Sequence, residues 1–216
     1  MKVLSTNIAH PQECSNEPFR LTGIDKRPAN QLEVFIPGPS YGDGSGVKGD
    51  TVGDTKHHGG AQKAVYAFAR EELDFWSQKL GRELSNGSFG ENLTTGGIDW
   101  KQAVINQRFA VGSAVLEVSI SRQPCRTFAE WLNQKGWVKT FTQHGDCGAY
   151  LRVITPGIIK PGDALEILHM PSHGITMGEL FAASVRGDKA VARKLFEAQC
   201  LPQLYHERMA KLIGAV

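Results

Sequence analysis

Short apolar runs interrupted by glycine and proline are the feature that most restricts how this chain can fold. The run Gln31–Ile36 alternates apolar and polar residues and stops at Pro37, Gly38 and Pro39, which is typical of a β-strand. Further strands are expected within Ala64–Ala69, Arg108–Ile120, Tyr150–Ile154 and Gly157–Leu168. Many short strands with frequent glycine turns favour a mainly β protein, a closed or nearly closed β-barrel, over a doubly wound sheet.

Helical patterns are few and lie mostly at the C-terminal end. Ala69–Leu80 has helical spacing and stops at Gly81, and a short helix is expected around Trp131. Three short amphipathic helices are expected at 177–185, 188–198 and 202–212, because capping residues or Pro202 mark their starts. We therefore expect a barrel domain over residues 1–168 and a three-helix subdomain over residues 174–216, docked on the barrel or on a partner.

Composition excludes several classes of protein. The chain of 216 residues carries 24 basic and 22 acidic residues, and 41% of it is hydrophobic. The net charge of +2 argues against a surface that binds nucleic acid polymers, although a local basic pocket is still compatible with it. No apolar run is long enough to span a membrane, and the first ten residues do not resemble a signal peptide. Four scattered cysteines without a CxxC spacing indicate free thiols in a reducing cytoplasm.

Cys125 is the most informative single residue. Before it, Leu116, Val118 and Ile120 alternate with polar residues, as in a strand with one apolar face and one polar face. Pro124 should end the strand pairing and leave Cys125 at the rim of the sheet. The flanking guanidiniums of Arg122 and Arg126 favour the thiolate, which is nucleophilic and binds soft metals. The alternative is a small buried hydrophobic residue, which is the commoner role of cysteine.

A second group of polar residues surrounds two glycines. His57, His58, Gly59 and Gly60 are followed by Lys63, and a loop of this kind can direct backbone amides and an ammonium at an anion. The two histidines point in different directions on an extended chain, so a shared metal ion is not favoured. The segment is equally typical of a polar pocket wall or of a plain turn before a buried strand.

Two further segments offer polar side chains. Glu91 and Asn92 follow Gly90, and they could read hydrogen-bond donors on a ligand or cap a local turn. Arg152 could clamp a phosphate or form a surface ion pair. Residues 41–53 hold five glycines and predict either a flexible loop or a close approach to a ligand. No phosphate-binding loop, dinucleotide fingerprint, serine-hydrolase elbow or HExxH motif is present.

Taken in order, these segments resemble the MOSC family, the molybdenum cofactor sulfurase C-terminal domain, and within it the stand-alone YiiM-type members. The resemblance covers roughly residues 46–168, and the helical tail from Gly174 resembles the extension of that group. The segments that carry the resemblance are Gly49-Asp50, His58-Gly59-Gly60, Lys63-Ala64-Val65, Phe89-Gly90-Glu91-Asn92-Leu93, Val111-Gly112, Gln123-Pro124-Cys125 and Gly148–Val153.

The resemblance implies a β-barrel that binds the molybdenum cofactor, a pterin dithiolene also called molybdopterin, with Cys125 as the metal ligand. It also implies reduction of N-hydroxylated compounds, such as N-hydroxylated nucleobases and amidoximes, with electrons from a separate donor protein. An amphipathic tail is compatible with a homodimer. The residues expected to contact the cofactor are His58, Gly59, Gly60, Lys63, Glu91, Asn92, Arg122, Arg126 and Arg152.

Two departures from the family pattern stand out. His57 precedes the usual histidine, and Cys147 stands where relatives more often have a small residue, so a second thiol could disturb metal ligation or pair with Cys125. Two other functions remain open on the sequence. One is a sulfur carrier or transferase with a persulfide on Cys125, and the other is a cofactor-binding module without catalytic activity.

Overall fold

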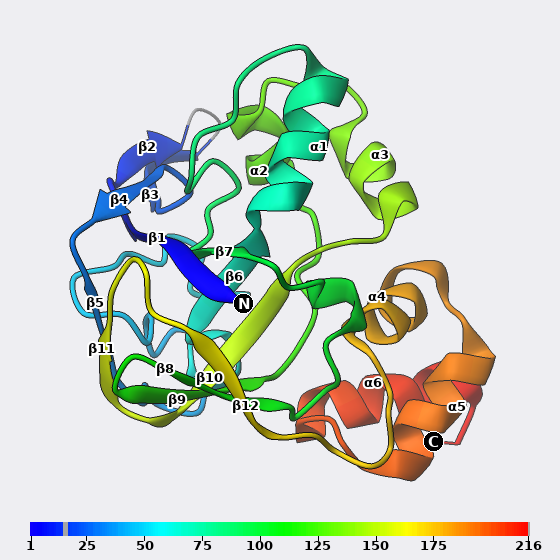
Figure 1. Ribbon diagram of the computed structural model, residues 1–216. Coiled ribbons are helices and arrows are strands. Elements are labelled where there is room, and N and C mark those ends of the chain that lie inside the picture. Colours follow the sequence, from blue (N-terminus) through cyan, green and yellow to red (C-terminus); the bar gives the residue numbers. More distant parts are fainter. Residues whose placement is uncertain (15–16, 216) are drawn as a thin grey trace.

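An eight-stranded sheet is the centre of the computed structural model, which describes residues 1–14 and 17–215 (Figure 1). Only the β6–β7 pair is parallel; the other neighbours within this sheet are antiparallel. In spatial order the strands are β12 (Leu165–His169), β8 (Arg108–Val111), β9 (Ala114–Val118), β10 (Ala149–Thr155), β6 (Val65–Ala69), β7 (Leu93–Gly96), β1 (Lys2–Ala9) and β4 (Lys26–Ala29). Two small sheets pair β2 (Gln12–Cys14) with β3 (Glu17–Thr22), and β5 (Leu32–Val34) with β11 (Gly157–Ile159).

The large sheet curls until β1 meets the chain segment that leads into β12. The Val3 amide donates to the Asp163 carbonyl over 2.8 Å, and the Leu165 amide donates to the Met1 carbonyl over 3.1 Å. Lys2 and Ala164 form an antiparallel bridge between these two hydrogen bonds. The prediction of a mainly β, nearly closed barrel is therefore confirmed.

The segment before Cys125 differs from its predicted pattern. The polar residues Glu117, Ser119 and Ser121 are buried like the apolar ones, because other side chains cover that face: the Ser119 hydroxyl, for instance, donates to Gln62 Oε1 over 2.7 Å. The strand β9 also ends at Val118, earlier than Pro124. Backbone hydrogen bonds with Tyr150 continue only to Ile120.

Three helices hold the chain on both sides of the cysteine. They are α1 (Arg70–Leu80), α2 (Arg126–Trp131) and α3 (Trp137–His144), and the sequence pattern predicted the first two but not the third. Their aromatic side chains form one cluster with a loop residue, in which ring centroids are 4.6 to 6.1 Å apart. The members of this cluster are Trp76, Phe89, Phe128, Trp137 and Phe141. All five are fully buried, so the chain that follows Cys125 is firmly packed.

The C-terminal helices lie close to their predicted positions. They are α4 (Met177–Arg186), α5 (Lys189–Ala198) and α6 (Gln203–Ile213). Thr176 and Glu179 form the expected capping box at the start of α4, and Asp188 caps α5. Pro202 is the residue before α6 rather than a residue of its first turn.

These helices pack on the protein's own barrel (Figure 1). The Met177 amide donates to the Ala103 carbonyl over 2.8 Å, and Asn106 Nδ2 donates to the Cys200 carbonyl over 2.9 Å. Apolar residues of the helices and of the barrel belong to one buried core, so a boundary between two domains near residue 170 stays a prediction. No helix in the described ranges has the length and apolar character that a membrane span requires.

Candidate functional site: a cationic cavity beside Cys125

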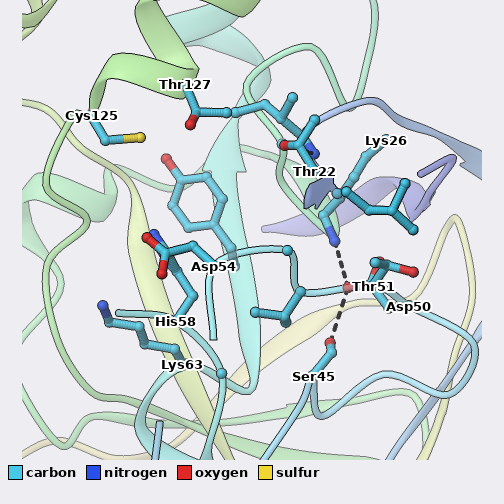
Figure 2. A pocket seen from close by; sticks show the side chains of 18 of the residues that line it. Thr22, Lys26, Ser45, Asp50, Thr51, Asp54, His58, Lys63, Cys125 and Thr127 are labelled. Atoms are coloured by element: carbon cyan, nitrogen blue, oxygen red, sulfur yellow. Dashed lines mark hydrogen bonds and ion pairs between the residues drawn. The ribbon is translucent and has the colours of Figure 1, made fainter. Parts of the chain in front are cut away.

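A cavity of about 290 Å³ lies between the barrel, the β2–β3 hairpin and the start of α2. This volume is close to the lower end of the range for ligand pockets, about 300–1,000 Å³. In Figure 2, Cys125, Asp54, His58 and Lys63 are on one side, and Lys26, Ser45 and Asp50 are on the other. The lining residues with charged or ring side chains are Arg20, Lys26, Asp50, Asp54, His58, Lys63, Tyr66, Arg122, Arg126 and Tyr150.

Cys125 borders this cavity as a half-buried free thiol. It is the residue before α2, with an extended backbone (φ −127°, ψ 174°), and its carbonyl accepts the Ala129 amide of that helix over 3.1 Å. The cysteine is therefore held between a buried extended segment and a helix, while its side chain adjoins open space. This arrangement is unlike that of a thiol sealed in the core.

Arg122 brings a buried positive charge to the wall of the cavity. Its side chain is 6% exposed, and its guanidinium lies 4.0 Å from the Phe128 ring centroid and 4.8 Å from that of Tyr66. One nitrogen donates to the Phe89 carbonyl. Among the side chains that the structure describes, no ion pair joins this guanidinium to a carboxylate. A buried charge without a counter-charge is costly, so this wall is suited to an anionic ligand.

Lys63 adds a second positive charge to the same wall. It lies at the end of the short helix η1 (Ala61–Lys63), and its ammonium donates to the His57 carbonyl over 2.6 Å. The same ammonium is 4.8 Å from the ring centroid of Tyr41 and 5.5 Å from that of Tyr150. Burial, and then the nearby charge of Arg208, lower the pKa of Lys63 to about 8, so this amine can release a proton near neutral pH.

His58 is a neutral imidazole in this cavity. Burial, followed by the charges of Lys63 and Arg122, lowers its pKa to about 4. Its Nδ1 is 3.4 Å from the Tyr150 hydroxyl, and Tyr150 pairs with Tyr66 across β10 and β6. The imidazole therefore offers a hydrogen-bonding group without adding to the positive charge.

The two glycines after His58 serve chain packing. Gly59 and Gly60 have φ of 85° and 74°, in the left-handed region that favours glycine. A Cβ on Gly60 would lie 2.2 Å from the Ser40 carbonyl oxygen, and one on Gly59 would lie 2.8 Å from that of Gly44. The Gly60 amide already donates to the Gly44 carbonyl over 2.9 Å. Gly59 borders the cavity and Gly60 does not, so the glycines fix the loop that carries His58 and Lys63.

Asn92 borders the cavity as part of a buried hydrogen-bond network around Asp50. Asp50 accepts from the Ala9 amide, from Ser45 Oγ over 3.0 Å, from Asn92 Nδ2 over 2.9 Å and from the Lys26 ammonium over 2.5 Å. The ion pair with Lys26 holds the pKa of Asp50 below its usual range, although burial opposes this shift. Asn92 also accepts the Tyr66 amide through Oδ1, so it joins three segments of the cavity wall.

Glu91, Arg152 and Arg126 have different surroundings. Glu91 is fully buried and accepts hydrogen bonds from the Gly87 and Phe89 amides and from the Thr94 hydroxyl. Arg152 pairs with Glu117 over 3.1 Å, and neither Glu91 nor Arg152 borders the cavity. Arg126 does border it, but its exposed guanidinium pairs with Glu130 over 3.0 Å.

Cys147 lies in the core and not on the cavity wall. It is 2% exposed, and its thiol donates to the Gly148 carbonyl over 3.3 Å. Burial raises the pKa of this thiol, so it stays protonated. Both Cys125 and Cys147 are free thiols, and the structure therefore does not support a disulfide between them.

Several lining residues were not predicted as site residues from the sequence. Arg20 and Lys26 come from the N-terminal strands, outside the segments that carried the resemblance, and no local pattern marks them. Asp50 lay within the segment Gly49-Asp50 that carried the resemblance, but no role was assigned to it. Tyr66 and Tyr150 lie in predicted strands and were given no role at the site, and only their pairing across β6 and β10 places both rings at the cavity.

Fold and cavity together define a β-barrel protein with a predominantly cationic cavity beside a cysteine. The MOSC domain family model matches residues 54–166, about half of the chain. YflK of Bacillus subtilis (strain 168) is 37% identical over 176 residues, which are 81% of this chain and 76% of that protein. The chain belongs to the MOSC family, which is associated with the molybdenum cofactor.

Proteins called YiiM are also similar. YiiM of Escherichia coli (strain K12) is 27% identical over 126 residues, 57% of this chain and 56% of that protein. The crystal structure of YiiM from Geobacillus stearothermophilus has a TM-score of 0.79 at 24% identity and covers 98% of both chains. The crystal structure of YiiM from Escherichia coli has a TM-score of 0.74 at 20% identity, covering 100% of this chain and 94% of that one. These two structures support the fold, including the helical tail.

Proposed function

We propose that this protein is a molybdenum cofactor-dependent oxidoreductase that reduces N-hydroxylated compounds, with Cys125 as the metal ligand. One observation carries the proposal: a half-buried thiol borders a cavity whose most buried positive charge, Arg122, has no ion pair to a carboxylate among the described residues. Family membership provides the cofactor class. The resemblance to the YiiM-type members implies the N-hydroxylated substrate class.

The donor set of the cavity suits this cofactor better than a bare metal ion. Among the described residues, no group of three or more histidine, cysteine, aspartate or glutamate side chains could hold a metal. A single thiolate is sufficient when the other sulfur ligands belong to a pterin dithiolene. Arg122 and Lys63 would hold the anionic part of such a cofactor, since a guanidinium and an ammonium bind phosphate, and Cys125 would hold the metal.

When bound, the cofactor would supply the two-electron redox chemistry needed to cleave an N–O bond. The net reaction consumes two electrons and two protons, turning R–NH–OH into R–NH₂ and water. A separate electron-donor protein would provide the electrons. Lys63 Nζ can deliver a proton to the cavity, because its pKa of about 8 leaves it mostly protonated at pH 7. The Tyr66 and Tyr150 rings, whose centroids are 5.2 Å apart, form an aromatic part of the cavity wall.

Elemental analysis of protein made in a host that synthesises the cofactor tests the proposal directly. We expect close to stoichiometric molybdenum and pterin in the wild-type protein, and electron-donor-dependent reduction of an amidoxime such as benzamidoxime. Loss of a residue that only orients a metal ligand typically lowers activity about 10–100-fold. Cys125→Ser should lower the reductase activity by more than this. Cys147→Ala is the matched control, because that thiol does not border the cavity.

Two results would contradict the reductase proposal. One is wild-type protein without molybdenum from a host whose other molybdenum enzymes are loaded. The other is a Cys125→Ser variant as active as Cys147→Ala. Native mass spectrometry of the same samples separates the sulfur-transfer alternative, because a persulfide on Cys125 would add the mass of one sulfur atom.

A further inference from the structure

The C-terminal helix α6 reaches the cavity wall through a pair of tyrosines. The Tyr205 hydroxyl of α6 and the Tyr41 hydroxyl lie 2.8 Å apart, so one donates to the other. Tyr205 is buried at 4% exposure, whereas Tyr41 belongs to the glycine-rich loop that precedes η1. A helix about 160 residues away in the sequence therefore holds a loop of the site.

Tyr41 in turn supports Lys63. The Lys63 ammonium packs against the Tyr41 ring at 4.8 Å and against the Tyr150 ring at 5.5 Å, and it donates a hydrogen bond to the His57 carbonyl. A cation over an aromatic face is stabilised by the ring. If the Tyr41 ring moved away, the ammonium would lose one of its two aromatic neighbours and would gain access to water.

We propose that Tyr205 is a positioning residue for Lys63. Its hydroxyl bond to Tyr41 fixes the ring against which the ammonium packs, and α6 thereby sets the exposure of this amine to the cavity. The helical extension is then part of the site and not only a docking appendage. The role of the amine as a proton donor rests on the proposed reductase activity, but its positioning does not.

Several other groups also influence the pKa of the Lys63 ammonium. Asp54 and Cys125 favour its charged form, and Arg208 of α6 opposes it. The phenol of Tyr150 and the imidazole of His58 face it from β10 and from the loop before η1. A test must therefore remove the tyrosine contact without altering any of these charges. Tyrosine-to-phenylalanine changes meet this requirement.

The experiment measures how fast Lys63 reacts with an amine-acylating reagent as a function of pH, by peptide mass spectrometry of the full-length protein without cofactor. We expect a midpoint near pH 8 for the wild-type protein. In Tyr205→Phe and in Tyr41→Phe the midpoint should rise by about one pH unit or more toward the ordinary lysine value of about 10.4, because burial is the largest cause of the lowered pKa and hydration of the amine outweighs the weakened contact with one ring. Leu204→Ala, an exposed change on α6, should leave it unmoved.

The double variant Tyr41→Phe/Tyr205→Phe sharpens the result. If both hydroxyls act through their one shared bond, the double variant should shift the midpoint no further than either single variant. An unchanged midpoint in Tyr205→Phe, or a double shift equal to the sum of the single shifts, would overturn the proposal. Because no cofactor is needed, this outcome is independent of whether the protein proves to be a reductase.

Discussion

Arg108 and Arg152 of the barrel, the paired group, differ from Arg122 at the cavity in one respect, which is whether a carboxylate accompanies the guanidinium. Glu117 of β9 forms an ion pair with Arg108 of β8 over 2.6 Å and another with Arg152 of β10 over 3.1 Å. At the cavity, Arg122 is more deeply buried than either of these arginines, yet it has no such partner in the part of the chain that the structure describes. Arg108 and Arg152 share one carboxylate partner, and Arg122 has none.

The difference indicates which charges serve the fold and which serve a ligand. A buried ion that lacks a counter-ion costs several kcal/mol, and the Phe128 and Tyr66 rings beside Arg122 offset only part of this cost because they carry no net charge. An anion in the cavity would supply the missing charge. Arg108 and Arg152 have less need of an anion, because each already pairs with Glu117.

The largest effect is expected from removal of the unpaired guanidinium. Arg122→Gln should reduce cofactor affinity about 10–150-fold, because a hydrogen bond to a charged group contributes about 1.5–3 kcal/mol. Arg152→Gln removes a guanidinium that is paired with Glu117, so the cofactor content of this variant should match that of the wild-type protein. The measurement is molybdenum and pterin per chain after gel filtration, for all three proteins purified in parallel. Equal cofactor in the two variants would refute the distinction between the groups.

The sequence allowed prediction of the features that depend on local pattern. Cys125, His58, Lys63 and Arg122 were all selected as site residues, and they do line one cavity. Their grouping followed from the motif order of the MOSC family, because spacing along the chain does not say which segments meet. The strands and the three C-terminal helices could be predicted for a simpler reason: apolar periodicity and capping residues act over a few positions.

What the sequence could not indicate depends on contacts between distant segments. Glu91 stands beside Asn92, but its carboxylate turns to the Gly87 and Phe89 amides while Asn92 faces the cavity. Arg152 follows Tyr150 on the same strand, yet it meets Glu117 of the neighbouring strand. Tyr205 acts on a loop about 160 positions away. Such pairings are set by register and docking, which leave no local signal.

The uncompensated charge of the cavity should also appear in the acid stability of the protein. His58 has a pKa of about 4 in the folded state, whereas an unfolded histidine titrates near 6.5. Between these values the unfolded chain binds more protons, so the free energy of unfolding falls as pH falls. His58 alone should contribute a loss of about 2 kcal/mol between pH 7 and 5. Urea unfolding of the cofactor-free wild-type protein and of His58→Gln at both pH values measures this contribution.

The His58→Gln variant isolates the contribution of His58 to this loss of stability. Burial raises the pKa of Asp146 to about 6, so the folded state binds a proton there more readily and acid acts in the opposite direction. That contribution is common to both proteins and cancels in the difference between them. The variant should lose less stability than the wild-type protein between pH 7 and 5. Identical losses would mean that His58 is not held neutral by the cavity.

The smallest effect is expected from the paired group itself. Arg152→Gln leaves Glu117 with Arg108, whose Nε still donates to Oε2, so the carboxylate is not left alone in the barrel. We expect the free energy of unfolding to fall by about 1 kcal/mol, which is comparable to the contribution of one hydrogen bond. A buried ion that loses its only partner costs more, about 3–5 kcal/mol. Urea unfolding at pH 7, with the exposed change Lys139→Gln as reference, measures it. A loss above about 3 kcal/mol would show that Arg108 does not neutralise Glu117 and that this group, too, carries an unbalanced charge.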